Sequence, residues 1–293
     1  MQQLDIFADS RDVALRNDVV EQLQLRDAAA ARAALTVLAG EYARDNALPA
    51  MTVLVHELEN ASTLAVTDHT ELAVICRHLE NEVAHAARQV LRGQYAQFWM
   101  ATCWRELAQR AAALPYRGAD PDGHAAPLWL RASDWAAASD AIESIESWWR
   151  IPSTVSWMTE ARYRAAGIDA AWPLFAELAW LAPAKFAALL VTLKDPSLDV
   201  LRRRFDAEFP GTGEIEDYAW FPAWLLINKP AVAGRLGQAR VRHDLPASRA
   251  TALLGEILRR EREGEQHELI ALRQEIRRLH TGLFDIYMAT RNV

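Results

Sequence analysis

Apolar residues recur at helical spacing along most of this chain. Between residues 11 and 25, for example, Val13, Val20 and Leu23 share one face. Residues with β-branched side chains are sparse and never alternate over the length of a strand. The pattern therefore predicts an all-α fold. Its first helices are expected over residues 11–25, 27–46, 49–59, 68–92 and 94–114.

A Pro-, Gly- and Asp-rich segment interrupts this pattern. Residues 115–127 read PYRGADPDGHAAP and have no apolar period, which is typical of a long loop. A chain of 293 residues can form two compact lobes or one elongated domain. We therefore predict a flexible or extended peptide over 1–9, an N-terminal helical lobe over 10–114, the loop over 115–127, and a repeat-like helical lobe over 128–293.

The end of the chain is predicted to form one helix over residues 264–291. Its apolar residues follow a heptad seam of under three heptads, which is too short for an independent coiled coil. We expect this helix to close the helical bundle, or alternatively to form the contact of a homodimer. The seam residues are Leu269, Leu272, Ile276, Leu279, Leu283 and Ile286.

An internal repeat relates two helical segments. Asp27, Ala31, Leu35, Leu38 and Tyr42 are matched at the same spacing by Asp134, Ala138, Ile142, Ile145 and Trp149, and a proline follows each copy. A further segment has Gly167, Ala171, Phe175 and Pro183 in a small–small–aromatic–proline register. These positions resemble the tetratricopeptide-like repeat families. The resemblance implies antiparallel helix pairs stacked into an α-solenoid with a peptide-binding inner face, and an irregular helical bundle is the alternative.

Tryptophan is concentrated in the middle of the chain. All 11 tryptophans lie between Trp99 and Trp224. Such a density builds either a thick core or an aromatic groove that binds a peptide. The groove hypothesis uses Trp129, Trp135, Trp149, Trp157 and Trp172.

Charge argues against nucleic-acid binding. The net charge is −7, whereas sequence-independent binding to phosphates needs unpaired Lys and Arg. From Val200 onward the chain has 15 basic and 13 acidic residues, so the excess of positive charge there is small. The arginines of 202–204 and 259–262 have acidic neighbours at helical spacing. We therefore expect exposed ion pairs and no direct contact with nucleic acid.

The sequence favours the cytoplasm. Cys76 and Cys103 have no partner at metal-ligand spacing, which suits thiols in a reducing compartment, and no secretory signal is recognisable. The apolar segment 170–193 contains Glu177 and Lys185 and two prolines. A membrane span would leave both charges in hydrocarbon, so two helices that meet near Pro183 are expected, and no membrane contact.

Only one weak metal-ligand pattern occurs. His78, Glu82 and His85 fall at i, i+4 and i+7 of a predicted helix, and no matching set lies on a second helix. A solvated helix face is the simpler interpretation, with no metal and no cofactor. A metal-dependent helical-bundle enzyme is the alternative, although the sequence has no recognisable catalytic motif.

The first residues of the chain form a short partner-binding motif. Gln3, Leu4, Asp5, Ile6 and Phe7 read QLDIF and resemble the peptide by which bacterial replication and repair proteins bind the DNA sliding clamp. The resemblance implies that the glutamine hydrogen-bonds at the rim of an apolar cleft, which the leucine and the terminal aliphatic–aromatic pair fill. The sequence thus predicts a non-catalytic helical-repeat adaptor for protein–protein interaction, recruited to the clamp through this peptide. Alternatively, Leu4, Ile6 and Phe7 pack on the protein's own first helix.

Overall fold

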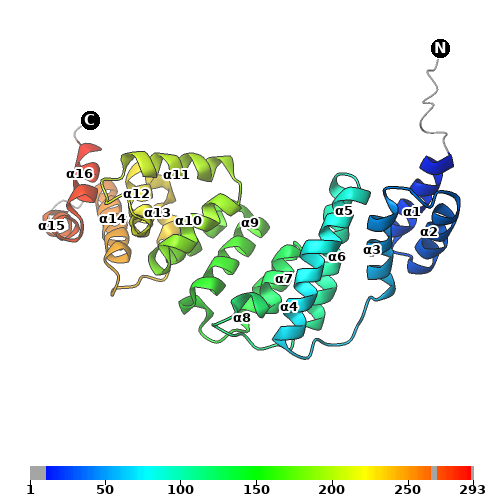
Figure 1. The fold of residues 1–293 in the computed structure, drawn as a ribbon. Helices are drawn as coiled ribbons and strands as arrows, with labels where there is room; N and C mark the ends of the chain where they lie inside the picture. Colours follow the sequence, from blue (N-terminus) through cyan, green and yellow to red (C-terminus); the bar gives the residue numbers. More distant parts are fainter. Residues whose placement is uncertain (1–10, 265–268, 292–293) are drawn as a thin grey trace, which may run out of the picture. The chain divides into compact units, whose positions relative to one another are not determined.

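The computed structural model describes residues 11–264 and 269–291, and Figure 1 shows that they are helical without any strand. The all-α prediction is thereby confirmed. The chain divides into two compact units, of which the first ends at Asp134 and the second begins at Trp135. The predicted loop over 115–127 lies within the first unit, and its last residues already belong to a helix. The QLDIF peptide, residues 3–7, lies outside the described residues.

Helices of the first unit pack against their neighbours along the chain, α1 on α2, α2 on α3 and α6 on α7. Their buried faces carry the periodic apolar residues, among them Val19, Leu35 and Leu54. Cys103 belongs to this core, where burial raises the pKa of its thiol to about 12. The helices are α1 (Arg11–Leu25), α2 (Ala28–Glu41), α3 (Leu48–Glu59), α4 (His69–His78), α5 (Ala84–Val90), α6 (Gln94–Arg110) and α7 (Ala125–Arg131).

The sequence repeat has a structural counterpart. In α2 the side chains of Ala31, Leu35 and Leu38 are buried, and at the matching positions Ala138, Ile142 and Ile145 are buried as well. Each copy precedes a helix that has proline in its first turn, α3 and α9 (Pro152–Leu181). The two segments therefore use the same positions for packing.

The second unit begins with α8 (Trp135–Glu143), which packs on the long helix α9. Gly167 breaks the helical geometry of α9, since its φ of 80° is a conformation that residues with a side chain rarely adopt. The apolar segment 170–193 divides between α9 and α10 (Pro183–Thr192), so two helices meet at Pro183 as predicted. In the described ranges no helix has the length and apolarity that crossing a membrane requires.

An aromatic core joins the next helices of the second unit. Phe186 of α10 and Phe205 of α11 both contact Phe221 of α12, with ring centroids 5.2 and 5.3 Å apart. All three rings are fully buried. Such tilted ring contacts stabilise packing beyond the area that they bury. The helices concerned are α10, α11 (Pro196–Glu208) and α12 (Phe221–Asn228), followed by the short α13 (Ala233–Leu236) and by α14 (Pro246–Glu263).

The predicted single helix over 264–291 is wrong, because the structure has α15 (Leu269–Leu279) and α16 (Thr281–Ala289) there. His280 has extended backbone angles, and its ring nitrogen Nδ1 accepts a hydrogen bond from the Leu283 backbone N–H at 3.0 Å. This contact caps a new helix and ends the old one. The heptad seam is therefore not continuous, and α16 packs on α15.

A partly buried carboxylate joins the last three helices. Glu261 of α14 accepts hydrogen bonds from Arg273 of α15, at 3.0 Å, and from the hydroxyl of Tyr287 in α16. Arg291 lies 2.8 Å from the same carboxylate. Burial by itself would raise the pKa of Glu261, but these partners outweigh it and lower the pKa below its ordinary value of 4.5. The ion-pair cluster thus fixes α15 and α16 on α14.

The cluster predicts a pH-dependent loss of stability in Tyr287→Phe. Removal of a hydrogen bond to a partly buried charge should lower the free energy of unfolding by about 1.5–3 kcal/mol at pH 7. Because the pKa of Glu261 is lowered in the folded state, its contribution is complete above the ordinary pKa and is lost as the pH falls through the folded value. The difference between wild type and variant, measured by urea denaturation, should therefore shrink at acidic pH.

A matched control is Tyr95→Phe, which removes a hydroxyl from a half-exposed ring in the first unit. It should change the free energy of unfolding by less than about 0.5 kcal/mol at either pH. A Tyr287→Phe effect that is equally small, or that grows as the pH falls, would contradict the role assigned to Glu261.

Candidate functional site

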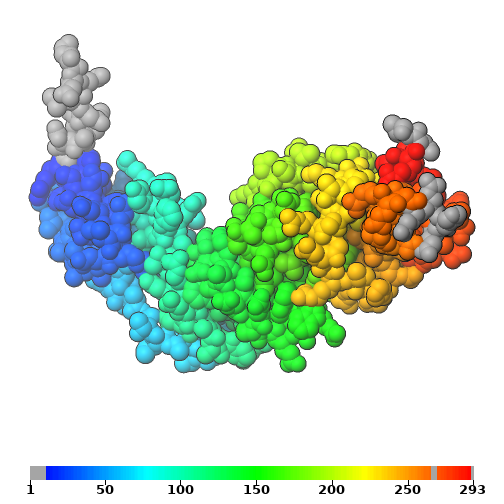
Figure 2. Space-filling view, turned by 180° about the vertical axis from the view of Figure 1, so that it is seen from behind, coloured from blue at the N-terminus to red at the C-terminus, as the bar shows by residue number. Residues whose placement is uncertain are grey.

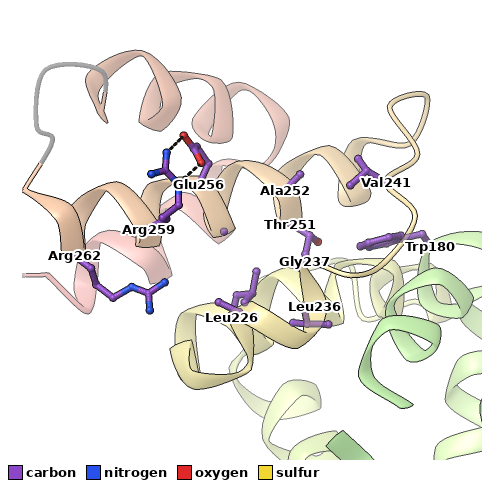
Figure 3. Close-up of a pocket in the computed structure, with 13 residues that line it drawn as sticks. Trp180, Leu226, Leu236, Gly237, Val241, Thr251, Ala252, Glu256, Arg259 and Arg262 are labelled. Atoms are coloured by element: carbon purple, nitrogen blue, oxygen red, sulfur yellow. Dashed lines mark hydrogen bonds and ion pairs between the residues drawn. The ribbon is translucent and has the colours of Figure 1, made fainter. Parts of the chain in front are cut away.

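The second unit has an apolar groove along one side of α14. The groove encloses about 360 Å³, and Figure 3 shows Leu226 and Leu236 facing α14 across it, with Trp180 and Val241 at one end. The α12–α13 segment and α14 pack side by side, and in the space-filling view the corresponding yellow and orange segments are neighbours at the surface (Figure 2). The floor on the α14 side consists of the small residues Ala252 and Gly255.

The sequence of α14 explains why this side stays open. Its buried face carries Leu254, Ile257 and Leu258, which pack the helix into the unit. The neighbouring face carries Ala252 and Gly255, which are too small to fill the space above them. A Cβ atom added to Gly255 would have no neighbour within 4 Å. Packing within the second unit therefore does not require glycine at this position.

Charged residues lie at the opposite end of the groove. Glu256 accepts hydrogen bonds from Arg259 at 2.7 Å and from Arg260 at 2.5 Å, and these bonds lower its pKa to about 2. Figure 3 shows the Glu256–Arg259 contact beside the groove, with Arg262 further along the helix. Arg259 and Arg260 have acidic partners at helical spacing, as the sequence predicted, whereas Nε of Arg262 donates a hydrogen bond to the backbone oxygen of Leu258.

A loop after α13 separates this groove from a second hollow. Arg240 donates its backbone N–H to Oε1 of Glu177 in α9, at 2.9 Å, and Arg242 donates its backbone N–H to Oγ of Ser248 in α14, at 2.8 Å. Glu177 and Ser248 are both buried. Buried acceptors of this kind fix backbone position, because an unpaired N–H beside them would be costly. The loop is thus anchored on both of the helices that flank it.

The second hollow encloses about 370 Å³ and has a polar, largely cationic lining. Nη1 of Arg240 lies 3.1 Å from Oε2 of Glu177, while its guanidinium carbon lies 5.2 and 5.7 Å from the ring centroids of Trp148 and Trp149. Trp148 is buried, whereas Trp149 is 41% exposed. Arg150 and His243 complete the exposed lining. This hollow therefore combines an accessible aromatic ring with several positive charges.

The five tryptophans of the predicted aromatic groove differ in their unit and in their burial. Trp149 lines the cationic hollow, whereas Trp172 is buried against Phe175 at 5.6 Å between ring centroids. Trp129 is in the first unit, and Trp135 and Trp157 are in the second. All three side chains are partly buried. Of the five residues, Trp149 alone lines one of the two hollows described above.

A π-helical turn, Leu79–Val83, follows His78, contains Glu82 and ends before His85. The wider turn changes the register on which a shared face depends. His78 lies between Glu57, at 3.2 Å from Nε2, and Glu82, at 3.4 Å from Nδ1, while His85 is exposed. Over residues 11–264 and 269–291, no group of three or more His, Cys, Asp or Glu side chains is arranged to hold a metal ion.

Sequence reasoning missed the residues that form the groove and anchor its loop. In the sequence Glu177 argues against membrane insertion, but a lone carboxylate in an apolar segment also indicates a buried polar contact. Gly255 lies within an otherwise strong helical pattern, where glycine is unfavourable and has to be explained. Leu226 and Leu236 gave no signal, because apolar residues in helices are usual.

The open space above Gly255 predicts that Gly255→Ala stabilises the protein. Alanine is favoured over glycine inside a helix, and the added methyl group would meet nothing within 4 Å. The free energy of unfolding should therefore rise by about 0.5–1 kcal/mol, measured by urea denaturation. In the control Gly264→Ala the backbone φ of 79° disfavours alanine, so stability should fall. A loss of stability in Gly255→Ala would show that the site is packed.

Comparison with known proteins gives no relative on which to base a function. No family model matches the chain, and no curated protein or solved structure matches it either. The chemical character of the site therefore has to be taken from its own residues. They form an apolar groove and a cationic, aromatic hollow on the two sides of one anchored loop.

Proposed function

We propose that this protein is a non-catalytic helical adaptor, whose second unit binds an apolar segment of a protein partner in the groove along α14. The N-terminal QLDIF peptide would recruit it to the DNA sliding clamp. The observation that carries the first part is the groove itself, with the apolar walls of Leu226 and Leu236 and the open floor at Gly255.

Several properties of the groove suit a peptide segment. Its volume is that of a site for a few side chains, and its walls are mainly aliphatic and aromatic. Insertion of apolar side chains would remove about 25 cal/mol of unfavourable hydration for each Å² that is buried. The small residues of α14 would let the backbone of a bound segment come close to the helix, as small residues do at close helix contacts.

A side chain that fills the groove should prevent peptide binding. We suggest selecting a displayed library of random peptides on the full chain, and then measuring the best peptides against Gly255→Leu by fluorescence anisotropy. The Cβ atom of the leucine would meet nothing within 4 Å, so the variant should fold, and the rest of the side chain would occupy the groove. We expect a loss of at least about tenfold in affinity, or about 1.4 kcal/mol.

Gly40→Leu is the matched control, because a Cβ atom at Gly40 of α2 would also meet nothing within 4 Å and the residue lies in the first unit. This variant should bind the selected peptides as the wild type does. If no peptide is enriched on the wild type, or if both leucine variants bind equally well, the groove has no role in partner binding.

The proposed tether is independent of the groove. Gln3, Leu4, Asp5 and Phe7 match the clamp-binding pattern. Ile6 replaces the usual leucine of that pattern but keeps its volume and apolarity. Burial of three apolar side chains would contribute several kcal/mol before ordering costs, which suits a dissociation constant in the micromolar range. A peptide is well suited to such a contact because it pairs with a cleft without rearranging the rest of the protein.

A peptide of residues 1–12 should bind purified bacterial sliding clamp with a dissociation constant of roughly 1–100 μM, measured by calorimetry. The double variant Gln3→Ala, Phe7→Ala should abolish binding, because it removes the rim hydrogen bond and the ring that fills the cleft. Gln2→Ala, outside the motif, is the control and should bind normally. A wild-type peptide that fails to bind below about 100 μM would remove the tether from the proposal.

A further inference from the structure

We propose that the segment bound by the second unit is acidic as well as apolar. Its apolar side chains occupy the α14 groove, the segment crosses Val241, and its carboxylates bind in the cationic hollow beside Trp149, Arg150 and Arg240. The inference rests on the proposed function, since it names the chemistry of the partner that the groove receives.

The two hollows are joined at one residue. Val241 lines both of them and is 39% exposed. The residues before and after it are held by hydrogen bonds to Glu177 and Ser248, so the loop presents Val241 from a fixed position. An extended segment that leaves the apolar groove across Val241 therefore arrives in the cationic hollow. Because the site is preorganised, little loop ordering opposes binding.

The charges of the second hollow favour carboxylates. Its one buried carboxylate, Glu177, already has Arg240 as partner, and the exposed Asp244 has Arg242 at 3.4 Å. Arg150 is exposed, and within the described part of the chain it has neither an ion pair nor a side-chain hydrogen bond. His243 adds a further donor. The hollow is thus locally positive in a chain whose net charge is −7, which attracts acidic ligands there.

The arrangement of Arg240 also suits a carboxylate. Its side chain is 54% exposed, although Nη1 is held by Glu177 and the guanidinium lies against Trp148 and Trp149. A guanidinium held in this way loses little freedom when its remaining N–H groups bind a carboxylate. The exposed ring of Trp149 lies beside it and would contact the apolar part of a neighbouring side chain.

Sequencing the peptides selected on the wild-type chain tests this inference. We expect apolar residues followed or preceded by Asp and Glu, well above their frequency in the unselected library. Arg150→Gln should weaken the selected peptides about three- to tenfold, and their affinity should fall as salt is raised. Arg44→Gln is the matched control, because Arg44 is an exposed arginine of the first unit without a described ion pair, and it should leave affinity unchanged.

The outcomes separate this inference from the proposed function. If peptides are selected and Gly255→Leu lowers their affinity, the adaptor function stands. If those peptides are neutral or basic and Arg150→Gln leaves their affinity unchanged, only the inference of an acidic partner is overturned. If no peptide is selected, the proposed function itself fails. Exchange of the acidic residues of a selected peptide for Asn and Gln should reproduce the loss seen with Arg150→Gln, and an unchanged affinity would also overturn the inference.

Discussion

The aromatic core of the second unit is the interaction on which its site depends. Phe186, Phe205 and Phe221 bring α10, α11 and α12 together through buried ring contacts. Once α12 is fixed in this way, α14 has a surface to pack against, and the groove forms where small residues of α14 leave space beside it. The groove is therefore a consequence of where large side chains fill the core and where small ones border it.

Buried polar contacts then complete what apolar packing begins. Hydrophobic burial has no direction, so it cannot fix the path of the loop between α13 and α14. Glu177 and Ser248 accept hydrogen bonds from the backbone of that loop, and Glu261 joins α14 to the two last helices. Glu177 and Ser248 thereby decide where Arg240 and Val241 lie, and with them the character of the two hollows.

Much of the site could not be read from the sequence because it depends on residues far apart in the chain. In the sequence Trp149 stands out only as one of a group of tryptophans, and the structure places it at the cationic hollow. Its neighbour Arg240 is distant in sequence and becomes a partner only through the anchored loop. Trp172, equally prominent in the sequence, is buried in the core against Phe175.

The sequence by itself determined the helical class of the protein, the approximate positions of the helices before residue 115 and the meeting of two helices near Pro183, because helical periodicity and capping are local properties. It also determined the pairing of the arginines with acidic neighbours, since helical spacing brings such residues together. Only the tertiary structure decided that α15 and α16 are separate helices around His280, that a π turn follows His78, and that Gly255 borders an open groove. Those features depend on which side chains meet across helices, which a local pattern does not contain.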